Sequence, residues 1–222
     1  MRSKAGPKAL ALGCALFLGA CNGPEVYMQF GQLAKQSFSN ILGNRRITRE
    51  EAASIPFASL GYRIGRTNEQ MLVLSSQTNT DQLWTSATRV VFLTRQGRLV
   101  RTVGLDHDLS AFDASRSKSV PAPAEALKRP FKSIRIVDYP DLSAYGSPIS
   151  CSARLLGRRG VTILGSKMNL SRVDEVCRSV NLDWSFTDSY WIEPETGFVW
   201  RSIQHTHPKM DAIEMEVLRR PT

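Results

Sequence analysis

The chain has 222 residues, of which 42% are hydrophobic and 22% charged, and its formal net charge is +9. This length allows one substantial hydrophobic core or two small ones. The charge is moderate, and the sequence has neither the arginine-rich clusters nor the aromatic RNA-binding motif that are typical of nucleic-acid-binding proteins. No apolar run reaches the roughly 20 residues that a membrane-spanning helix needs.

The first 20 residues have the organisation of a secretory signal peptide. Three basic residues stand among the first eight positions, and residues 9–20 follow without a charge. A basic start, a short apolar core and small residues at its end are typical of an export signal. The letters LGAC that end at Cys21 resemble a bacterial lipobox, which implies cleavage before Cys21 and acylation of that cysteine. The alternative is an ordinary signal peptide with an incidental cysteine.

Removal of residues 1–20 lowers the formal charge from +9 to +6. That charge suits an anionic lipid surface or an acidic polysaccharide, and a merely solubilising role is the alternative. Asn22 follows the lipidated cysteine, where an aspartate would retain well-studied lipoproteins at the inner membrane. We therefore expect an outer-membrane, lipid-anchored protein that faces the periplasm, with the covalent lipid on Cys21 as its only attached group.

The four cysteines fall into three classes on this interpretation. Cys14 leaves with the signal peptide, Cys21 carries the lipid, and Cys151 and Cys177 remain. An even pair in an exported chain favours a disulfide, and two buried thiols are the alternative. The spacings are not those of a redox or zinc motif, so the cysteines predict neither redox catalysis nor a metal site.

Two helices are expected near the N-terminus of the mature chain, after a tether at residues 21–28. Apolar residues recur with helical spacing at Phe30, Leu33, Ala34, Phe38, Ile41 and Leu42. Thr48 with Glu51 three residues later has the pattern of a capping box, and it predicts a short helix that ends before Pro56.

Beyond Pro56 the sequence is typical of β-strands. Residues 58–64 alternate with period two, which predicts a half-buried strand, and the segments MLVLSS, TRVVFLTR and RLVRTV follow. Gln96-Gly97 between the last two predicts a tight hairpin. Strands in succession without intervening helices favour antiparallel pairing, so we expect a meander sheet, either a curved sheet, a sandwich or a half-barrel.

Residues 114–130 are rich in Ser, Pro, Ala and cations, which predicts a long loop inside one β-rich domain covering 29–222. A second series of strands follows it. The segment LSRVDEVC is ambiguous between helix and strand, and we favour strand because strands flank it.

The last strands contain the candidate contact residues. In residues 182–193 one parity is apolar and the other polar, except for Trp191. A four-residue loop at 194–197 would place Glu193 opposite Phe198 and Trp191 opposite Trp200, whereas a five-residue loop would pair Tyr190 with Trp200. Trp191, Trp200 and Arg201 are the predicted glycan or partner contacts, with packing in the core as the alternative role of the aromatic pair.

Three segments carry a family resemblance: IPFASLGYRIG, TRQGRLVRTVGLDHDL and DSYWIEPETGFVWRSIQ. Together they resemble the YjbF/GfcB family of lipoproteins associated with group 4 capsule and exopolysaccharide gene clusters. The resemblance implies an outer-membrane-anchored, mainly antiparallel β protein that acts beside other envelope proteins in polysaccharide secretion. It implies no catalytic residues, and the pair Cys151/Cys177 and the Pro-Ala loop are particular to this chain.

Catalytic and metal motifs are sparse. His205-x-His207 lacks an evident third ligand, and neighbours in Asp106-His107-Asp108 would point to opposite faces of a strand. No nucleophile elbow, zinc-protease motif or nucleotide-binding loop occurs. The carboxylate pairs Asp183 with Glu193 and Asp188 with Glu195 keep a hydrolase open, because such a pair is defined by distance.

The sequence therefore predicts a non-catalytic lipoprotein that binds glycan or a partner protein during polysaccharide production and export. We expect no metal, no cofactor and no nucleic-acid partner. The alternatives are a glycan-modifying hydrolase and a carrier of lipid or lipoprotein, which would need an apolar groove in a concave sheet.

Overall fold

The computed structural model describes residues 43–112 and 120–221. The predicted signal peptide, Cys21, the tether and the helix beginning at residue 29 lie outside the described residues. Within the described part of the chain, no helix has both the length and the apolar character needed to cross a bilayer.

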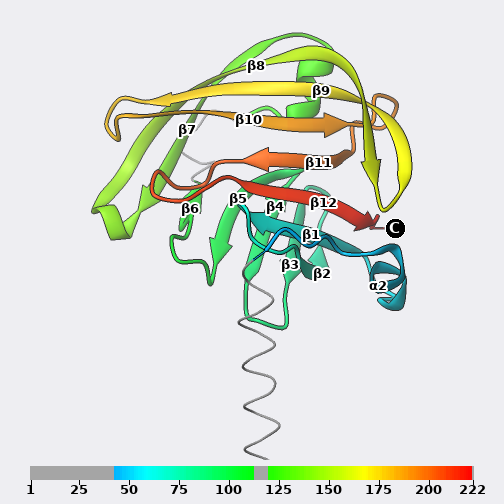
Figure 1. The fold of residues 1–222 in the computed structure, drawn as a ribbon. Coiled ribbons are helices and arrows are strands. Elements are labelled where there is room, and N and C mark those ends of the chain that lie inside the picture. Colours follow the sequence, from blue (N-terminus) through cyan, green and yellow to red (C-terminus); the bar gives the residue numbers. More distant parts are fainter. Residues whose placement is uncertain (1–42, 113–119, 222) are drawn as a thin grey trace, which may run out of the picture. The chain divides into compact units, whose positions relative to one another are not determined.

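In the part of the chain that the structure describes, twelve strands form one antiparallel sheet that curls into a half-barrel (Figure 1), which confirms the mainly β prediction. The strands are β1 (Ser59–Ile64), β2 (Gln70–Gln77), β3 (Asp81–Thr85), β4 (Val91–Arg95), β5 (Arg98–Val103), β6 (Ala111–Phe112), β7 (Phe131–Tyr139), β8 (Ala144–Ile163), β9 (Ser166–Ser179), β10 (Trp184–Ile192), β11 (Val199–Gln204) and β12 (Ile213–Arg219).

The sheet consists of two meanders joined by one long-range pairing. The first meander runs from β5 back to β1 and the second from β12 back to β6, and β1 pairs with β12 between them. The meanders agree with the sequence prediction. The pairing of the first strand with the last was not predicted, because no local pattern specifies which strand edges meet.

The largest hydrophobic cluster packs on β1 to β5, β11 and β12. Its members are Leu60, Tyr62, Leu72, Trp84, Val90, Phe92, Leu99, Ile213, Met215 and Val217. The prediction that the first strand is half-buried is wrong for most of its length, because Ser59 to Tyr62 are all buried. The loop after the strand and the segment before it explain this. The buried carboxylate of Glu69 lies over Gly61, and it accepts a hydrogen bond from the backbone N–H of Ile47 at 2.7 Å.

The short helix α2 (Arg49–Ser54) confirms the capping-box prediction. The Glu51 backbone N–H donates to Thr48 Oγ1 at 3.2 Å, and the Thr48 backbone N–H donates to Glu51 Oε2 at 2.9 Å. The helix stops before Pro56 because the residue that precedes a proline disfavours helical dihedral angles.

The hairpin between β4 and β5 is also as predicted. Gln96 and Gly97 form its two-residue turn, and both have positive φ, at 49° and 83°. Positive φ at both central residues matches the right-handed twist of the flanking strands.

The predicted loop at 114–130 is wrong for its second half. Residues 113–119 lie outside the described part, but Pro123–Leu127 form a 3₁₀ helix, η1. Ala126 of η1 is buried against Val173 and Tyr190, so this segment covers the sheet. Its loop-like composition conceals it, because only two of its residues, Pro123 and Ala126, are fully buried and both are small.

The strands β8 and β9 form a long hairpin that contains the segment LSRVDEVC, which is a strand as predicted. Cys151 and Cys177 are direct cross-strand partners in this hairpin and form the predicted disulfide. A second 3₁₀ helix, η2 (Pro140–Leu142), connects β7 to β8.

The hairpin of β10 and β11 has the predicted four-residue loop but a different register. The Glu193 backbone N–H donates to the Phe198 carbonyl at 2.8 Å, as the four-residue loop requires. A register shift between Trp191 and Ile192 then places Trp191 opposite Arg201, so the predicted pairing of Trp191 with Trp200 is wrong. A single extra residue in one strand is a β-bulge, which the alternation of residue types does not specify.

Candidate functional site

A cavity of about 890 Å³ lies beside the largest hydrophobic cluster. It is bounded by β1, β3, β4, β11 and β12, the turns at 77–80 and 194–197, helix η1 and part of β8. Its size falls within the range of ligand-binding pockets. Because many separate elements line the cavity, no single sequence motif could predict it.

The floor of the cavity is apolar and partly aromatic. Leu60, Met215 and Val217 contribute from β1 and β12, and Trp200 contributes from β11. Phe198 meets Trp200 edge to face, with ring centroids 5.1 Å apart. Such a surface can pack against the apolar face of a ring-shaped ligand.

The wall contributed by β3 and β4 is fixed by a buried hydrogen bond. The indole Nε1 of Trp84 donates to Thr94 Oγ1 at 3.0 Å, and both residues line the cavity. This bond satisfies the polar atom of a buried tryptophan. The wall is therefore preformed.

Amides and hydroxyls from the turns and the adjoining strand ends dominate the rim of the cavity. They are Gln77, Thr78, Asn79, Thr80, Gln82, Gln96 and Thr196. Side chains of this kind both donate and accept hydrogen bonds. An apolar floor beneath such a polar rim suits a ligand that carries many hydroxyl groups on a ring.

The charged side chains that line the cavity are paired with one another or with neighbours. Lys128 Nζ lies 3.3 Å from Glu125 Oε1, and Arg158 lies 4.0 Å from Glu195. These exposed pairs contribute little to stability. Arg220 lies 3.2 Å from Glu193, a residue outside the lining.

Arg201 borders the cavity, but its guanidinium packs over the Trp191 ring and is held by two buried carboxylates of β12. Its guanidinium lies 2.5 Å from Glu214 and 3.4 Å from Glu216. Burial alone would raise the pKa of Glu214, but hydrogen bonds and charges from Arg46, Arg201 and Arg63 outweigh burial and lower that pKa. Burial prevails at Glu216, whose pKa is raised. The carboxylates fix Arg201 in place.

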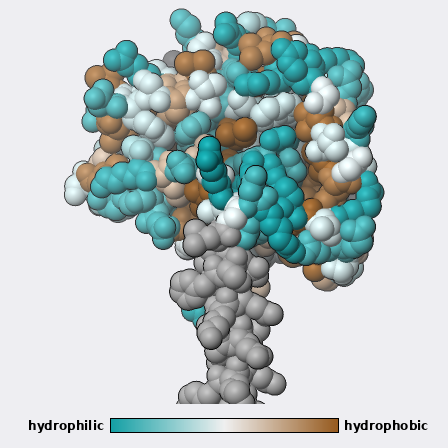
Figure 2. Space-filling model, in the orientation of Figure 1, coloured by the Kyte–Doolittle hydropathy of each residue, from teal (hydrophilic) through white to brown (hydrophobic). Residues whose placement is uncertain are grey.

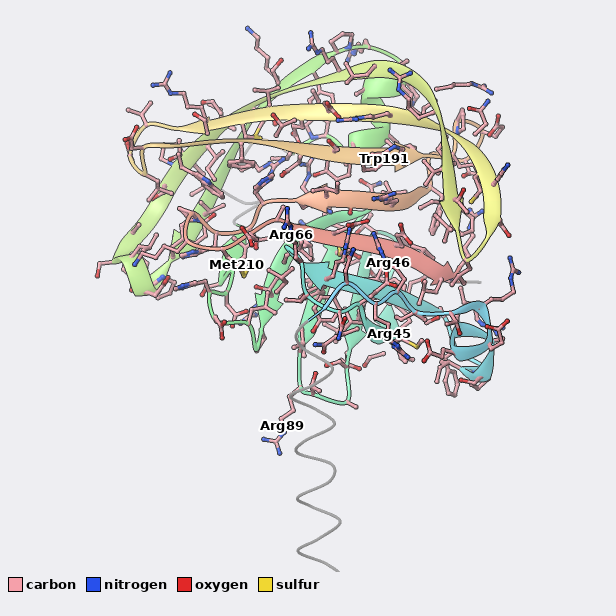
Figure 3. The ribbon with its side chains drawn as sticks, in the orientation of Figure 1. Arg45, Arg46, Arg66, Arg89, Trp191 and Met210 are labelled. Carbon is pink, nitrogen blue, oxygen red and sulfur yellow. A yellow bond between two sulfur atoms is a disulfide. The ribbon has the colours of Figure 1, made fainter. Side chains whose placement is uncertain are left out.

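The three predicted contact residues do not share one surface. Trp200 and Arg201 line the cavity. Trp191, on β10 (Figure 3), is only 8% exposed and packs against Val161, Ile163 and Leu170. That burial leaves little of the indole face for a ligand. Phe198 and Trp84 line the cavity and were not predicted as contacts.

The carboxylate pairs considered for a hydrolase do not form a catalytic pair. Asp183 and Glu193 flank β10, which at about 3.3 Å per residue separates them by roughly 30 Å. A glycosidase pair needs a separation below about 10 Å. Asp188 is fully buried and lies 3.1 Å from Arg135, whereas Glu195 is an exposed turn residue.

A cluster of His107, Asp141 and His207 forms where helix η2 meets the loops after β5 and β11, and its donor set could hold a metal ion. Asp141 lies 2.9 Å from His107 Nδ1 and 3.1 Å from His207 Nε2. Hydrogen bonds and charges from both imidazoles lower the pKa of Asp141, against the opposing effect of burial. The sequence interpretation missed Asp141 because only the fold brings it to the histidines.

The cluster geometry fits hydrogen bonding better than metal binding. The two imidazole rings stack with their planes 4° apart and centroids 4.6 Å apart. Ligand lone pairs lie in the ring planes, so parallel rings do not aim at one ion. The Lys209 backbone N–H also donates to His207 Nδ1 at 3.1 Å, which places the proton of a neutral ring on Nε2.

The family described as "Group 4 capsule polysaccharide lipoprotein gfcB, YjbF" matches residues 36–218 of the chain. A search of curated proteins gave no match.

Two solved structures of lipoproteins are similar to the chain. A hypothetical lipoprotein, YmcC, from Escherichia coli K12 has 17% identity over 86% of this chain and 95% of that chain, with a TM-score of 0.66. A putative lipoprotein from Parabacteroides distasonis has 9% identity over 73% of this chain and 94% of that chain, with a TM-score of 0.31. The first supports the fold, and the second is too distant to support an argument.

Proposed function

Because the chain belongs to the YjbF family of group 4 capsule polysaccharide lipoproteins, we propose that it is a non-catalytic accessory component that binds glycan during capsule or exopolysaccharide production and export. The single observation that carries this proposal is the cavity of about 890 Å³ with its aromatic floor and polar rim.

The chemistry of the cavity suits sugar rings. A pyranose has apolar C–H faces that pack on Trp200 and Phe198, and its hydroxyls lie at the edge, where the amides and hydroxyls of the turns stand. The charged groups at the cavity are held by neighbouring opposite charges. Uncharged sugar units therefore fit the cavity better than acidic ones, because an acid would have to compete with the existing pairs.

A lipid carrier is the second candidate, and the apolar floor of Leu60, Met215 and Val217 favours it. An acyl chain has no hydrogen-bonding groups to match the polar rim, whereas a sugar does. We therefore place glycan binding first.

The test is a binding titration of the mature protein with neutral oligosaccharides released from the polymer of the producing cell. Trp200→Ala removes the aromatic floor and should weaken binding about tenfold, equivalent to about 1.4 kcal/mol. Phe57→Ala is the matched control, since Phe57 is 62% exposed and does not line the cavity. Glycan binding that is absent in the wild type, or unchanged in Trp200→Ala, contradicts the proposal. Binding of fatty acids by a protein that binds no glycan would favour the lipid carrier.

We also propose that Cys21 carries the acyl anchor and that the protein resides at the outer membrane, facing the periplasm. Labelling of cells with a palmitate analogue should mark the wild type but not Cys21→Ala. The labelled protein should fractionate with outer membranes. Label that persists in Cys21→Ala would place the lipid elsewhere, and pull-down with the anchored protein would identify envelope partners.

A further inference from the structure

A second surface, separate from the cavity, lies on the outward side of strands β7 to β10. Alternate residues of these strands point away from the core and are exposed. Their register places Ser152 between Lys132 and Val176, and places Arg178 between Ser150 and Ser185. We call this surface the outer face: Lys132, Ile134, Ser150, Ser152, Arg154, Val176, Arg178, Ser185 and Thr187.

The centre of the outer face is uncharged. Ile134 is 54% exposed and Val176 is 51% exposed, so both present apolar surface to solvent. Ser150, Ser152 and Thr187 stand beside them and present hydroxyl groups. In the space-filling view, hydrophilic, neutral and hydrophobic residues are mixed over the region of β8 to β10 (Figure 2).

Three cations surround this centre: Lys132, Arg154 and Arg178. All three are exposed, and their side chains form no ion pair with a residue that the structure describes. Asp174, the cross-strand partner of Arg154, is instead bound by Arg172 at 2.8 Å. The cations at the cavity and on β11 are paired, so this group differs from them.

The spacing of these cations follows from the register. At about 4.8 Å between strands and 3.4 Å per residue, Lys132 lies about 8 Å from Arg154 and about 12 Å from Arg178, measured between Cα atoms. Three positive charges at this spacing suit a polymer with repeated negative charges.

The same side of the sheet is covered elsewhere. Trp191 and Arg201 lie there beneath the end of the β8–β9 hairpin, and Glu214 is covered by Arg46 at 2.8 Å. The outer face is thus a part of this side that the described chain leaves open.

We propose that the outer face binds a polysaccharide that carries carboxylate groups. The choice of a polysaccharide rests on the function proposed above. Its carboxylates pair with Lys132, Arg154 and Arg178, its hydroxyls bond to the serines and Thr187, and its ring faces pack on Ile134 and Val176. On this proposal the cavity binds neutral sugar units and the outer face binds charged ones.

A membrane surface fits this face less well. Segments that bind anionic lipid typically gather four to eight lysines and arginines, and interfacial elements insert large apolar side chains such as Trp, Phe and Leu. The outer face has three cations, two β-branched apolar residues and four hydroxyls.

The experiment uses polygalacturonate as the probe and the mature lipidated protein in neutral phosphatidylcholine vesicles. The triple variant Lys132→Ser, Arg154→Ser, Arg178→Ser should bind at least tenfold more weakly and show a smaller loss of binding with added salt. The control triple variant, Arg66→Ser, Arg89→Ser, Arg219→Ser, removes the same charge from exposed sites elsewhere and should bind as the wild type does.

Two outcomes overturn the inference. Equal loss in both triple variants would mean that net charge, not the outer face, attracts the polymer. A wild-type preference for vesicles with phosphatidylglycerol that only the outer-face variant loses, without any binding of polygalacturonate, would assign the face to lipid. Neutral oligosaccharide binding that depends on Trp200 is measured in parallel, so failure at the outer face is distinguishable from failure at the cavity.

Discussion

Trp191 lies between two arginines, with the Cζ atoms of Arg172 and Arg201 at 5.3 and 5.0 Å from its ring centroid. This contact explains why an aromatic residue stands among polar ones on β10. The alternation of residue types identified the exception, but it could not distinguish a ligand platform from a ring covered by the end of another hairpin. The guanidinium groups and Leu170 occupy the faces that a sugar would need.

Trp191→Ala should therefore lower the free energy of unfolding by about 3 kcal/mol, because it leaves a cavity in a buried cluster. Trp191→Phe should cost less, since it retains a ring between the arginines. Denaturant unfolding checks both. An unfolding free energy of Trp191→Ala equal to that of the wild type would show that the indole is not packed as described.

Glu175 is fully buried and contacts Arg98 and Arg135. Burial would raise the pKa of Glu175, but the two guanidinium groups outweigh it and lower that pKa. Glu175→Ala should destabilise the protein by about 3–5 kcal/mol, because the buried Arg98 loses the carboxylate that it pairs with and the buried Arg135 keeps only Asp188.

The pH dependence of unfolding gives a second readout of Glu175. Since its folded pKa lies below its unfolded pKa, its contribution is present above about pH 4.5 and is lost as the pH falls through the folded pKa. The wild type should lose stability in acid more steeply than Glu175→Gln does. Parallel acid profiles for the two proteins would contradict this role.

His207 should produce a pH effect near neutrality. Burial lowers its pKa below the ordinary value, outweighing the attraction of Asp141, while His107 and Lys209 lower it further. Between the unfolded pKa of about 6.5 and the lower folded pKa, the unfolded chain binds the extra proton, so stability falls as the pH falls. His207→Gln should reduce the dependence of the unfolding free energy on pH between pH 7 and pH 5.5. If this pH dependence is the same in the variant and the wild type, His207 is not its source.

At the scale of elements, the local signals were reliable where the interaction itself is local. The capping box of Thr48 and Glu51 and the turn at Gln96-Gly97 each depend on residues within a few positions of one another. The bulge after Trp191 and the buried helix η1 depend on distant partners, such as Arg201 and Val173. The pattern of residues in the sequence therefore predicts local interactions, but it does not predict contacts between distant segments.

The β4–β5 turn offers a matched test with two glycines. Gly97 has a φ of 83°, and an added Cβ would clash with a methyl of Val199, so Gly97→Ala should cost more than about 1–2 kcal/mol. Gly160 has no heavy atom within 4 Å of such a Cβ and no positive φ, so Gly160→Ala should be neutral or stabilising. Thermal unfolding of both variants compares them, and equal costs would contradict the turn geometry.

The β8–β9 hairpin offers a test of the disulfide. Replacing both Cys151 and Cys177 with alanine should lower the free energy of unfolding by about 2–4 kcal/mol, mainly because the unfolded chain regains freedom. Wild-type protein unfolded under reducing conditions should match the double variant. A wild type that a reductant does not affect would mean that the bridge does not form in the cell.

At the scale of the whole molecule, the sequence sufficed for a mainly β chain of lipoprotein type and for its family. It did not suffice for the cavity, because Leu60, Trp84, Trp200 and Met215 come from four strands whose order in the sheet is not written in any one of them. Trp200 and Arg201 were predicted as contacts because aromatic residues cluster in the sequence of one hairpin, and that role stays a prediction. The outer face could not be predicted either, because identifying it requires the pairing register of the four strands β7 to β10.

The pairing of β1 with β12 has a consequence for how the protein is made. Ile213, Met215 and Val217 of β12 complete the core against β1, so the largest cluster cannot close before these residues are available. Contacts this far apart in the chain form late and slowly. On the export route proposed above, the N-terminus crosses the membrane first, so this cluster stays open until nearly the last residues have crossed, and its apolar side chains need protection from aggregation until then.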